Sequence, residues 1–131
     1  MRTGGASRGE VSAETATVFG ALMLMVFLVI GAASYSLASH VASVGALQGA
    51  RRGSVVLGDS GTVFAASAER VETVVRELGS ELARPPRVSV TGHDIRVVVT
   101  VRTIAPLGFL PREVTRTATV PVEAYVRESE R

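Results

Sequence analysis

The chain has 131 residues, no cysteine and 47% hydrophobic residues. This length allows one membrane segment and one small domain of roughly eighty residues. Without cysteine there is no disulfide framework, thiolate metal site or catalytic thiol. The formal charge of +2 comes from Arg2 and Arg8, because the chain after residue 9 holds equal numbers of arginines and acids. The neutrality of the chain beyond residue 9 argues against nucleic acid as a partner, since that binding depends on neutralising phosphates.

The first feature along the chain is a run without charge from Thr15 to Ala50, with an almost wholly apolar centre at residues 18–30. A helix from Thr15 to Leu37 would be roughly 34 Å long, enough for the hydrocarbon layer of about 30 Å. The sequence therefore predicts one transmembrane helix. Its membrane residues include Val18, Leu22, Val26 and Ile30.

The orientation follows from the flanking charges. Arg2 and Arg8 precede the span, and the positive-inside rule then predicts a cytoplasmic N-terminus and a C-terminal domain on the extracytoplasmic side. An ordinary signal peptide is the alternative, because small residues at 31–34 could form a cleavage site that releases a secreted domain.

The uncharged stretch continues past the apolar centre with a helical pattern. Leu37, Val41, Val44 and Leu47 recur at steps of four, three and three, which predicts a helix with one apolar stripe. Such a stripe needs a partner. Packing on the chain's own domain and packing on another subunit both fit the pattern.

The junction before the span holds the most informative residues. Arg8 and Gly9 stand just before the predicted helix, and Glu14 stands at its start. This arrangement resembles type IV pilin-like precursors, and the short leader and the spacing from Gly9 to Glu14 are most similar to the TadE-like minor pilins of tight-adherence (Flp) pilus systems.

The resemblance implies a specific processing event and a division of the chain. A prepilin peptidase would cut between Gly9 and Glu10 and leave the helix attached, so that Glu14 becomes the fifth mature residue. The chain then divides into a leader (1–9), the transmembrane helix with its extracytoplasmic extension (10–57) and a small α+β domain (58–131).

Glu14 has a chemistry that can be argued from the residues. A carboxylate at mid-bilayer costs on the order of 2.5–3.5 kcal/mol, so it needs a partner or a place near the surface. The amine freed at Glu10 would have a pKa of about 7.7–8.0 and could neutralise Glu14 of a neighbouring subunit during assembly. Alternatively, Glu14 lies in the headgroup region, where the start of a helix favours an acid.

The resemblance also implies partners and a location. We expect a minor pilin or pseudopilin of a bacterial tight-adherence pilus or related secretion system, with the prepilin peptidase, other pilin subunits and the pilus assembly platform as partners. It would be a single-pass cell membrane protein that can enter a pilus. A single-pass anchored binding domain unrelated to pili is the competing interpretation.

Beyond the span the pattern predicts a second helix and then strands. The helix begins near Asp59, Ser60 or Thr62, which can cap it, and ends at Arg84-Pro85-Pro86, because proline lacks the amide donor. Its apolar stripe is long. It comprises Phe64, Ala68, Val71, Val74, Val75, Leu78 and Leu82.

Alternation of apolar residues predicts a hairpin over residues 88–102 with a turn at 92–94. A third strand from Val114 to about Val126 contains Pro121, which favours an edge position or a break. The fold class is therefore α+β, with a long N-terminal helix, an amphipathic helix and a small antiparallel sheet. The segment 104–111 between strands two and three is unusually apolar, and either folds over the sheet or contacts another subunit.

The remaining polar residues do not form a recognisable active site. His40 and His93 have no spacing that suggests a shared metal, and Asp94 beside His93 does not complete a nucleophile motif. We expect no enzyme activity, no cofactor, no metal and no small-molecule substrate.

Overall fold

The computed structural model describes residues 7–56 and 59–122, with the backbone alone for residues 7–12. Two helices precede three strands: α1 (Ser7–Val55), α2 (Ser60–Glu77), β1 (Arg87–Thr91), β2 (Asp94–Arg102) and β3 (Glu113–Pro121). The strands form one antiparallel sheet in the order β1-β2-β3. The predicted α+β fold, with its long N-terminal helix, second helix and three strands, is confirmed.

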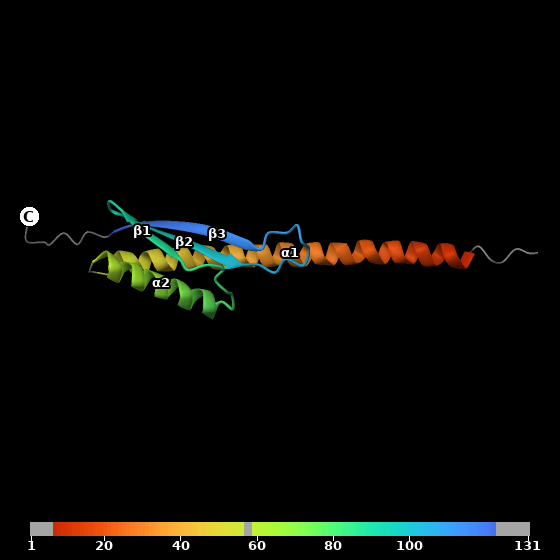
Figure 1. The fold of residues 1–131 in the computed structure, drawn as a ribbon, viewed down its shortest axis with the longest axis horizontal. Coiled ribbons are helices and arrows are strands. Elements are labelled where there is room, and N and C mark those ends of the chain that lie inside the picture. Colours follow the sequence, from red (N-terminus) through yellow and green to blue (C-terminus); the bar gives the residue numbers. More distant parts are fainter. Residues whose placement is uncertain (1–6, 57–58, 123–131) are drawn as a thin grey trace, which may run out of the picture.

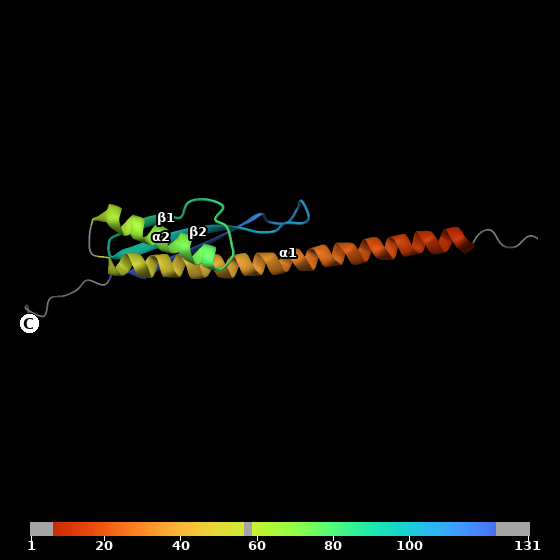
Figure 2. The same cartoon turned by 90° about the horizontal axis from the view of Figure 1, so that it is seen from below.

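α1 is one continuous helix of 49 residues, about 74 Å long at 1.5 Å per residue. α2 and the sheet lie along its C-terminal half, while its N-terminal half projects beyond the domain (Figures 1 and 2). Among the described residues, α1 is the one helix long and apolar enough to cross a membrane. The predicted span is therefore the first part of a longer helix whose second part forms a wall of the domain.

The face of α1 beneath the domain consists of small residues. Ala38, Ala42, Ala46 and Ala50 are four residues apart and at most 3% exposed. Gly45, Gly49 and Gly53 have the same spacing, and a Cβ at Gly49 would lie 2.5 Å from Val71 Cγ2 and 3.2 Å from the Ser67 carbonyl oxygen. Residues four apart share a helix face, so this small-residue face lets α2 approach the α1 backbone closely.

The apolar stripe predicted on this part of α1 is divided by the structure. Val41 is buried under the chain's own domain, whereas Leu37 is 59% exposed and Leu47 is 38% exposed. Val44 is half-buried. Packing on the chain's own domain therefore accounts for Val41 but leaves Leu37 and Leu47 uncovered.

α2 begins where the sequence predicts and ends earlier. Asp59 is the N-cap and accepts hydrogen bonds from the Thr62 hydroxyl and backbone N–H, which hold the pKa of its carboxyl below the usual range. At the other end Gly79 has a φ of +69°, and the N–H groups of Gly79 and Ser80 donate to the carbonyls of Arg76 and Val75.

This pattern is a Schellman motif, which ends a helix at a left-handed glycine. The prediction that α2 continues to Arg84-Pro85-Pro86 is therefore wrong, because Gly79 ends it first. The predicted stripe is also shifted, since Phe64 is 37% exposed and Leu78 is 45% exposed. The side chains that α2 buries are Val63, Ser67, Val71, Val74 and Val75.

The sheet supplies the other wall of the core. In β2, Ile95, Val97, Val99 and Val101 are at most 1% exposed, as the alternation of a half-buried strand requires. β3 places Arg116 opposite Val99 in the register, and Arg116 donates from Nε and NH2 to Ser39 Oγ on α1 at 3.0 and 2.7 Å. β3 is an edge strand that ends at Pro121, so the proline acts as predicted within the described residues.

Candidate functional site

The N-terminal part of α1 is the most unusual surface of the molecule. From Ala13 to Ile30 every side chain is exposed except that of Met23, which is half-buried. We call residues 13–30 the bare segment. Its exposed fractions include 60% for Phe19, 64% for Met25 and 62% for Val29. A contiguous apolar surface of this size marks a membrane or protein contact.

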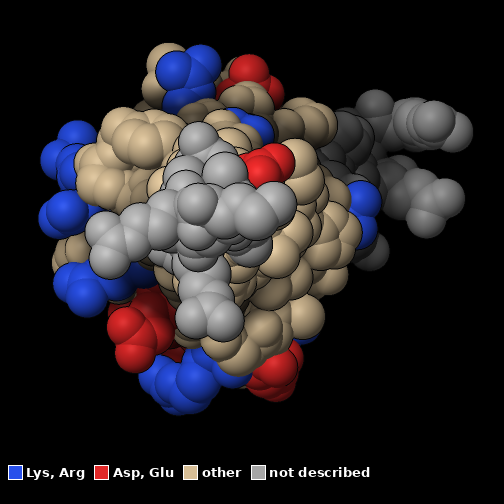
Figure 3. Space-filling view, turned by 90° about the vertical axis from the view of Figure 1, so that its right-hand side faces the viewer, with Lys and Arg blue, Asp and Glu red and all other residues tan. Residues whose placement is uncertain are grey.

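Figure 3 looks along α1 from its N-terminal end and shows the charged side chains around the periphery of the domain. The bare segment itself carries one charged residue, Glu14. The charges of the described part of the molecule therefore gather around the domain, and the projecting helix carries no charged side chain between Glu14 and Ile30 and only apolar ones from Val18 to Ile30.

A single row of side chains connects the bare segment to the uncovered side of the domain half. Glu14, Val18, Leu22, Val26 and Ile30 are four residues apart, and Leu37 and Val44 follow at intervals of seven. Each step of four turns the row by about 40° and each step of seven by about 20° in the opposite sense, so the row winds around α1 between Glu14 and Ile30 and stays on one side from Ile30 to Val44. Leu47 and Val55, which are 38% and 58% exposed, extend the row to the end of α1. We call these nine residues the outward row.

In the part of α1 beneath the domain, the outward row lies away from the small-residue face. Going around α1 at 3.6 residues per turn, Leu37 lies about 140–180° from Ala42 and Ala46, and Leu47 lies about 100–140° from them. The domain covers the small residues, half-buries Val44 and leaves Leu37, Leu47 and Val55 exposed. The row thus links the predicted membrane residues to Leu37 and Leu47 along α1, whereas the sequence predicted two separate stretches.

The predicted processing site lies inside the helix. α1 begins at Ser7, so Gly9 and Glu10 belong to its first turn, rather than to a segment before the helix as predicted. Peptidases need an extended peptide, and the first turn is the easiest part of a helix to unwind because its N–H groups have no intrahelical partners. Glycine weakens a helix by about 1 kcal/mol relative to alanine. Gly9 therefore lowers the free energy needed to unwind the helix around the peptide bond between Gly9 and Glu10.

Glu14 is exposed near the start of α1. It stands five residues after Gly9 and four before Val18, at the point where the helix turns wholly apolar. The partial positive charge of a helix N-terminus favours an acid within the first turns. If the chain were cut after Gly9, this charge and the new amine would stand close to Glu14.

The other candidate polar residues are not brought together. His40 on α1 and His93 in the turn between β1 and β2 are both exposed. In residues 7–56 and 59–122 no three histidine, aspartate or glutamate side chains are grouped as metal ligands. The described part of the chain therefore offers the outward row as its candidate site.

Comparisons with protein-family models, with curated proteins and with solved structures find no match for this chain.

Proposed function

We propose that this chain is a minor pilin or pseudopilin, a structural subunit of a bacterial tight-adherence pilus or related secretion system. The bare segment crosses the cell membrane, with the N-terminus in the cytoplasm and the domain outside. The observation that supports the proposal most strongly is the outward row, which begins at Glu14, five residues after Gly9.

The outward row has the properties of a surface that changes partner. In the membrane its first half faces lipid, which is as apolar as its side chains. In a filament the same side chains would pack against the helices of other subunits. Every member of the row except the half-buried Val44 is exposed, so one helix can serve in both environments without rearranging the domain.

Glu14 would govern the change between the two environments. Cleavage after Gly9 creates an amine at Glu10, and this cation on one subunit can pair with Glu14 on the next. A carboxylate that must leave the membrane surface during assembly needs such a partner, because its burial alone costs several kcal/mol. The proposal assigns this chain no catalytic role and no cofactor.

The two competing functions account for less of the molecule. An anchored binding domain needs the bare segment alone and does not explain an open apolar row that continues to Val55. A secreted domain cut near Ala33 would separate Gly31 from Leu110, whose side chain packs on it.

The mature N-terminus tests the proposal directly. The full chain is expressed in a bacterium that has a prepilin peptidase, and its intact mass and N-terminal sequence are determined. We expect the mature chain to begin at Glu10. Gly9→Leu should block this cut, while Gly20→Leu, where nothing lies within 4 Å of the new Cβ, should leave it unchanged. An uncut chain that stays in the membrane favours the anchored domain, and a start near Ser34 contradicts both.

Cross-linking tests the role of the outward row. Because the chain has no cysteine, single cysteines at Leu37 or Leu47 report contacts between subunits. Ala46→Cys is the matched control, since Ala46 is on the same helix and fully buried by the domain. We expect oxidation of assembled material to give dimers for the first two variants and none for the control. Equal yields from all three would contradict the assigned face.

A further inference from the structure

The connection between β2 and β3 projects from the sheet along α1. Its two most exposed apolar side chains are Ile104, 68% exposed, and Phe109, 73% exposed. Residues 103–111, which we call the apolar loop, contain no charged residue. In both ribbon views this loop reaches past the sheet toward the bare segment (Figures 1 and 2). It does not fold over the sheet, which was one of the two predicted positions.

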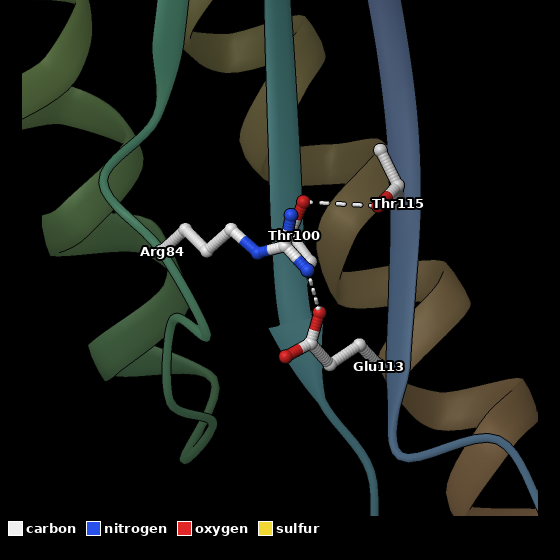
Figure 4. A network of polar contacts seen from close by, with 4 residues as sticks. All are labelled: Arg84, Thr100, Glu113 and Thr115. Atoms are coloured by element: carbon white, nitrogen blue, oxygen red, sulfur yellow. Dashed lines mark hydrogen bonds and ion pairs between the residues drawn. The ribbon is translucent and has the colours of Figure 1, made fainter.

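The base of the apolar loop is held by hydrogen bonds. The Thr103 N–H donates to the Arg112 carbonyl at 2.9 Å, and the Thr103 hydroxyl donates to the Pro111 carbonyl. Just beyond this neck, Glu113 accepts from Arg84 at 2.5 Å, beside a hydrogen bond of 2.9 Å between Thr100 and Thr115 (Figure 4). Near the tip the Leu110 N–H donates to the Leu107 carbonyl at 3.0 Å. The loop is therefore a formed structure that presents Phe109.

Two contacts place the apolar loop at a defined height on α1. The Ile104 N–H donates to Ser34 Oγ at 2.7 Å, and the Leu110 side chain covers the backbone of Gly31. A hydrocarbon layer of about 30 Å takes roughly 20 helical residues. If Glu14 stays at one surface, the layer extends from Thr15 to Ser34. The loop therefore meets the helix where the bilayer ends on the domain's side.

The polar groups around the apolar loop are of the kinds found where a hydrocarbon layer meets its headgroups. Arg102 and Arg112 flank the loop and are exposed, and arginines at such positions reach lipid phosphates while their stems cover apolar surface. A groove of about 420 Å³ between α1, the loop and the segment after α2 is lined by Leu37 and Ile104 together with the charged residues Arg102 and Glu81. Tyr35, 40% exposed, follows Ser34, and tyrosine is enriched at membrane interfaces.

We propose that the apolar loop inserts Phe109 and Ile104 into the membrane leaflet on the domain's side, so that the subunit is held at two points, α1 and the loop. An interfacial segment typically enters the boundary between headgroups and acyl chains by about 5–10 Å, which agrees with a contact at Gly31, three residues inside Ser34. The second point of attachment sets the domain's height and orientation on the membrane. The inference rests on the part of the proposed function in which the bare segment crosses the membrane.

Tryptophan fluorescence tests the insertion, because the chain has no native tryptophan. Three variants of the full chain, Phe109→Trp, Phe27→Trp and Phe64→Trp, are reconstituted in phosphatidylethanolamine and phosphatidylglycerol vesicles with or without lipids brominated near the top of the acyl chain. Phe27 lies in the bare segment, and Phe64 lies in the first part of α2. α2 begins at the end of the domain farthest from the bare segment (Figure 1).

We expect bromine to remove most of the emission of Phe109→Trp and Phe27→Trp and to leave that of Phe64→Trp unchanged. Emission from Phe109→Trp should also be blue-shifted relative to Phe64→Trp. Quenching of Phe109→Trp by aqueous iodide instead of bromine would overturn the inference. Blue-shifted emission that bromine does not quench would also overturn it, because the loop would then lie against a second protein copy.

Phe27→Trp distinguishes a loop that does not insert from a bare segment that does not cross the membrane. If bromine does not quench Phe27→Trp, then the bare segment does not cross the membrane and the anchor of the proposed function is wrong. If bromine quenches Phe27→Trp and not Phe109→Trp, the span is supported and the loop insertion alone is wrong.

Discussion

The two parts of α1 differ in a way that hydropathy alone does not anticipate. The bare segment contains the largest apolar side chains of the helix, and they are exposed. Residues 31–55, the covered segment, bury alanines and glycines instead. The more hydrophobic part is thus the uncovered one. The difference indicates that close backbone approach, and not side-chain size, holds α1 in the domain, and that the domain leaves the large apolar side chains of the bare segment uncovered.

An arginine introduced into each part of α1 should give the largest difference between the two parts. Leu22 and Leu47 are exposed leucines on the same outward row. We expect Leu22→Arg to raise the apparent free energy of membrane insertion by about 2.5–3.5 kcal/mol, the cost of arginine near a bilayer centre. Leu47→Arg should leave insertion unchanged. Glycosylation mapping of the full chain in microsomes measures both, and equal effects would contradict the division of α1.

A side chain added to the small-residue face should have the next largest effect. A Cβ at Gly49 meets Val71 and the Ser67 carbonyl, whereas one at Gly20 meets nothing within 4 Å. We expect Gly49→Val to lower the free energy of domain unfolding by about 1–3 kcal/mol, the typical cost of overpacking. Gly20→Val is the matched control and should leave the domain's stability unchanged. Denaturant titration in detergent, followed by circular dichroism, measures the difference.

The smallest effect should come from the cap of α2, beyond the covered segment. Hydrogen bonds from Thr62 lower the pKa of Asp59, so its stabilising contribution is fully present above the unfolded pKa of about 3.9 and is lost as the pH falls through the lower folded pKa. Asp59→Asn also caps helices well and does not titrate there. Thermal melts should therefore agree at neutral pH, and the wild-type chain should lose more stability than the variant in strong acid. Identical acid dependence would contradict a role for the Asp59 charge.

Much of the fold could be predicted from residues that are close in sequence. The uncharged run in α1, the Asp59 cap, the alternation in β2 and the break at Pro121 are local signals, and the structure contains each element. The end of α2 is also determined by a local signal, but we predicted it from Pro85 and Pro86 instead of from Gly79. A glycine with a positive φ ends a helix as a proline does. Leu78-Gly79 was therefore the local signal for the end of α2.

The candidate site depends both on the local sequence and on how the domain packs on α1. The spacing of Gly9, Glu10 and Glu14 was visible in the sequence, because it involves only residues that are close together along the chain. The outward row was not visible as one surface, because the side of α1 that stays open depends on where the domain packs. Val41 and Leu37 have similar hydropathy, yet the first is buried and the second exposed.

The sequence by itself determined that this chain has one apolar helix long enough for a membrane, an acid at its start and an α+β remainder, because these features depend on composition and local periodicity. Tertiary structure alone decided which face of α1 the domain covers and that the apolar loop meets α1 at Gly31 and Ser34. Residues 34 and 104 are 70 positions apart. No local pattern encodes such a contact, since it results from how α2 and the sheet pack on the small-residue face.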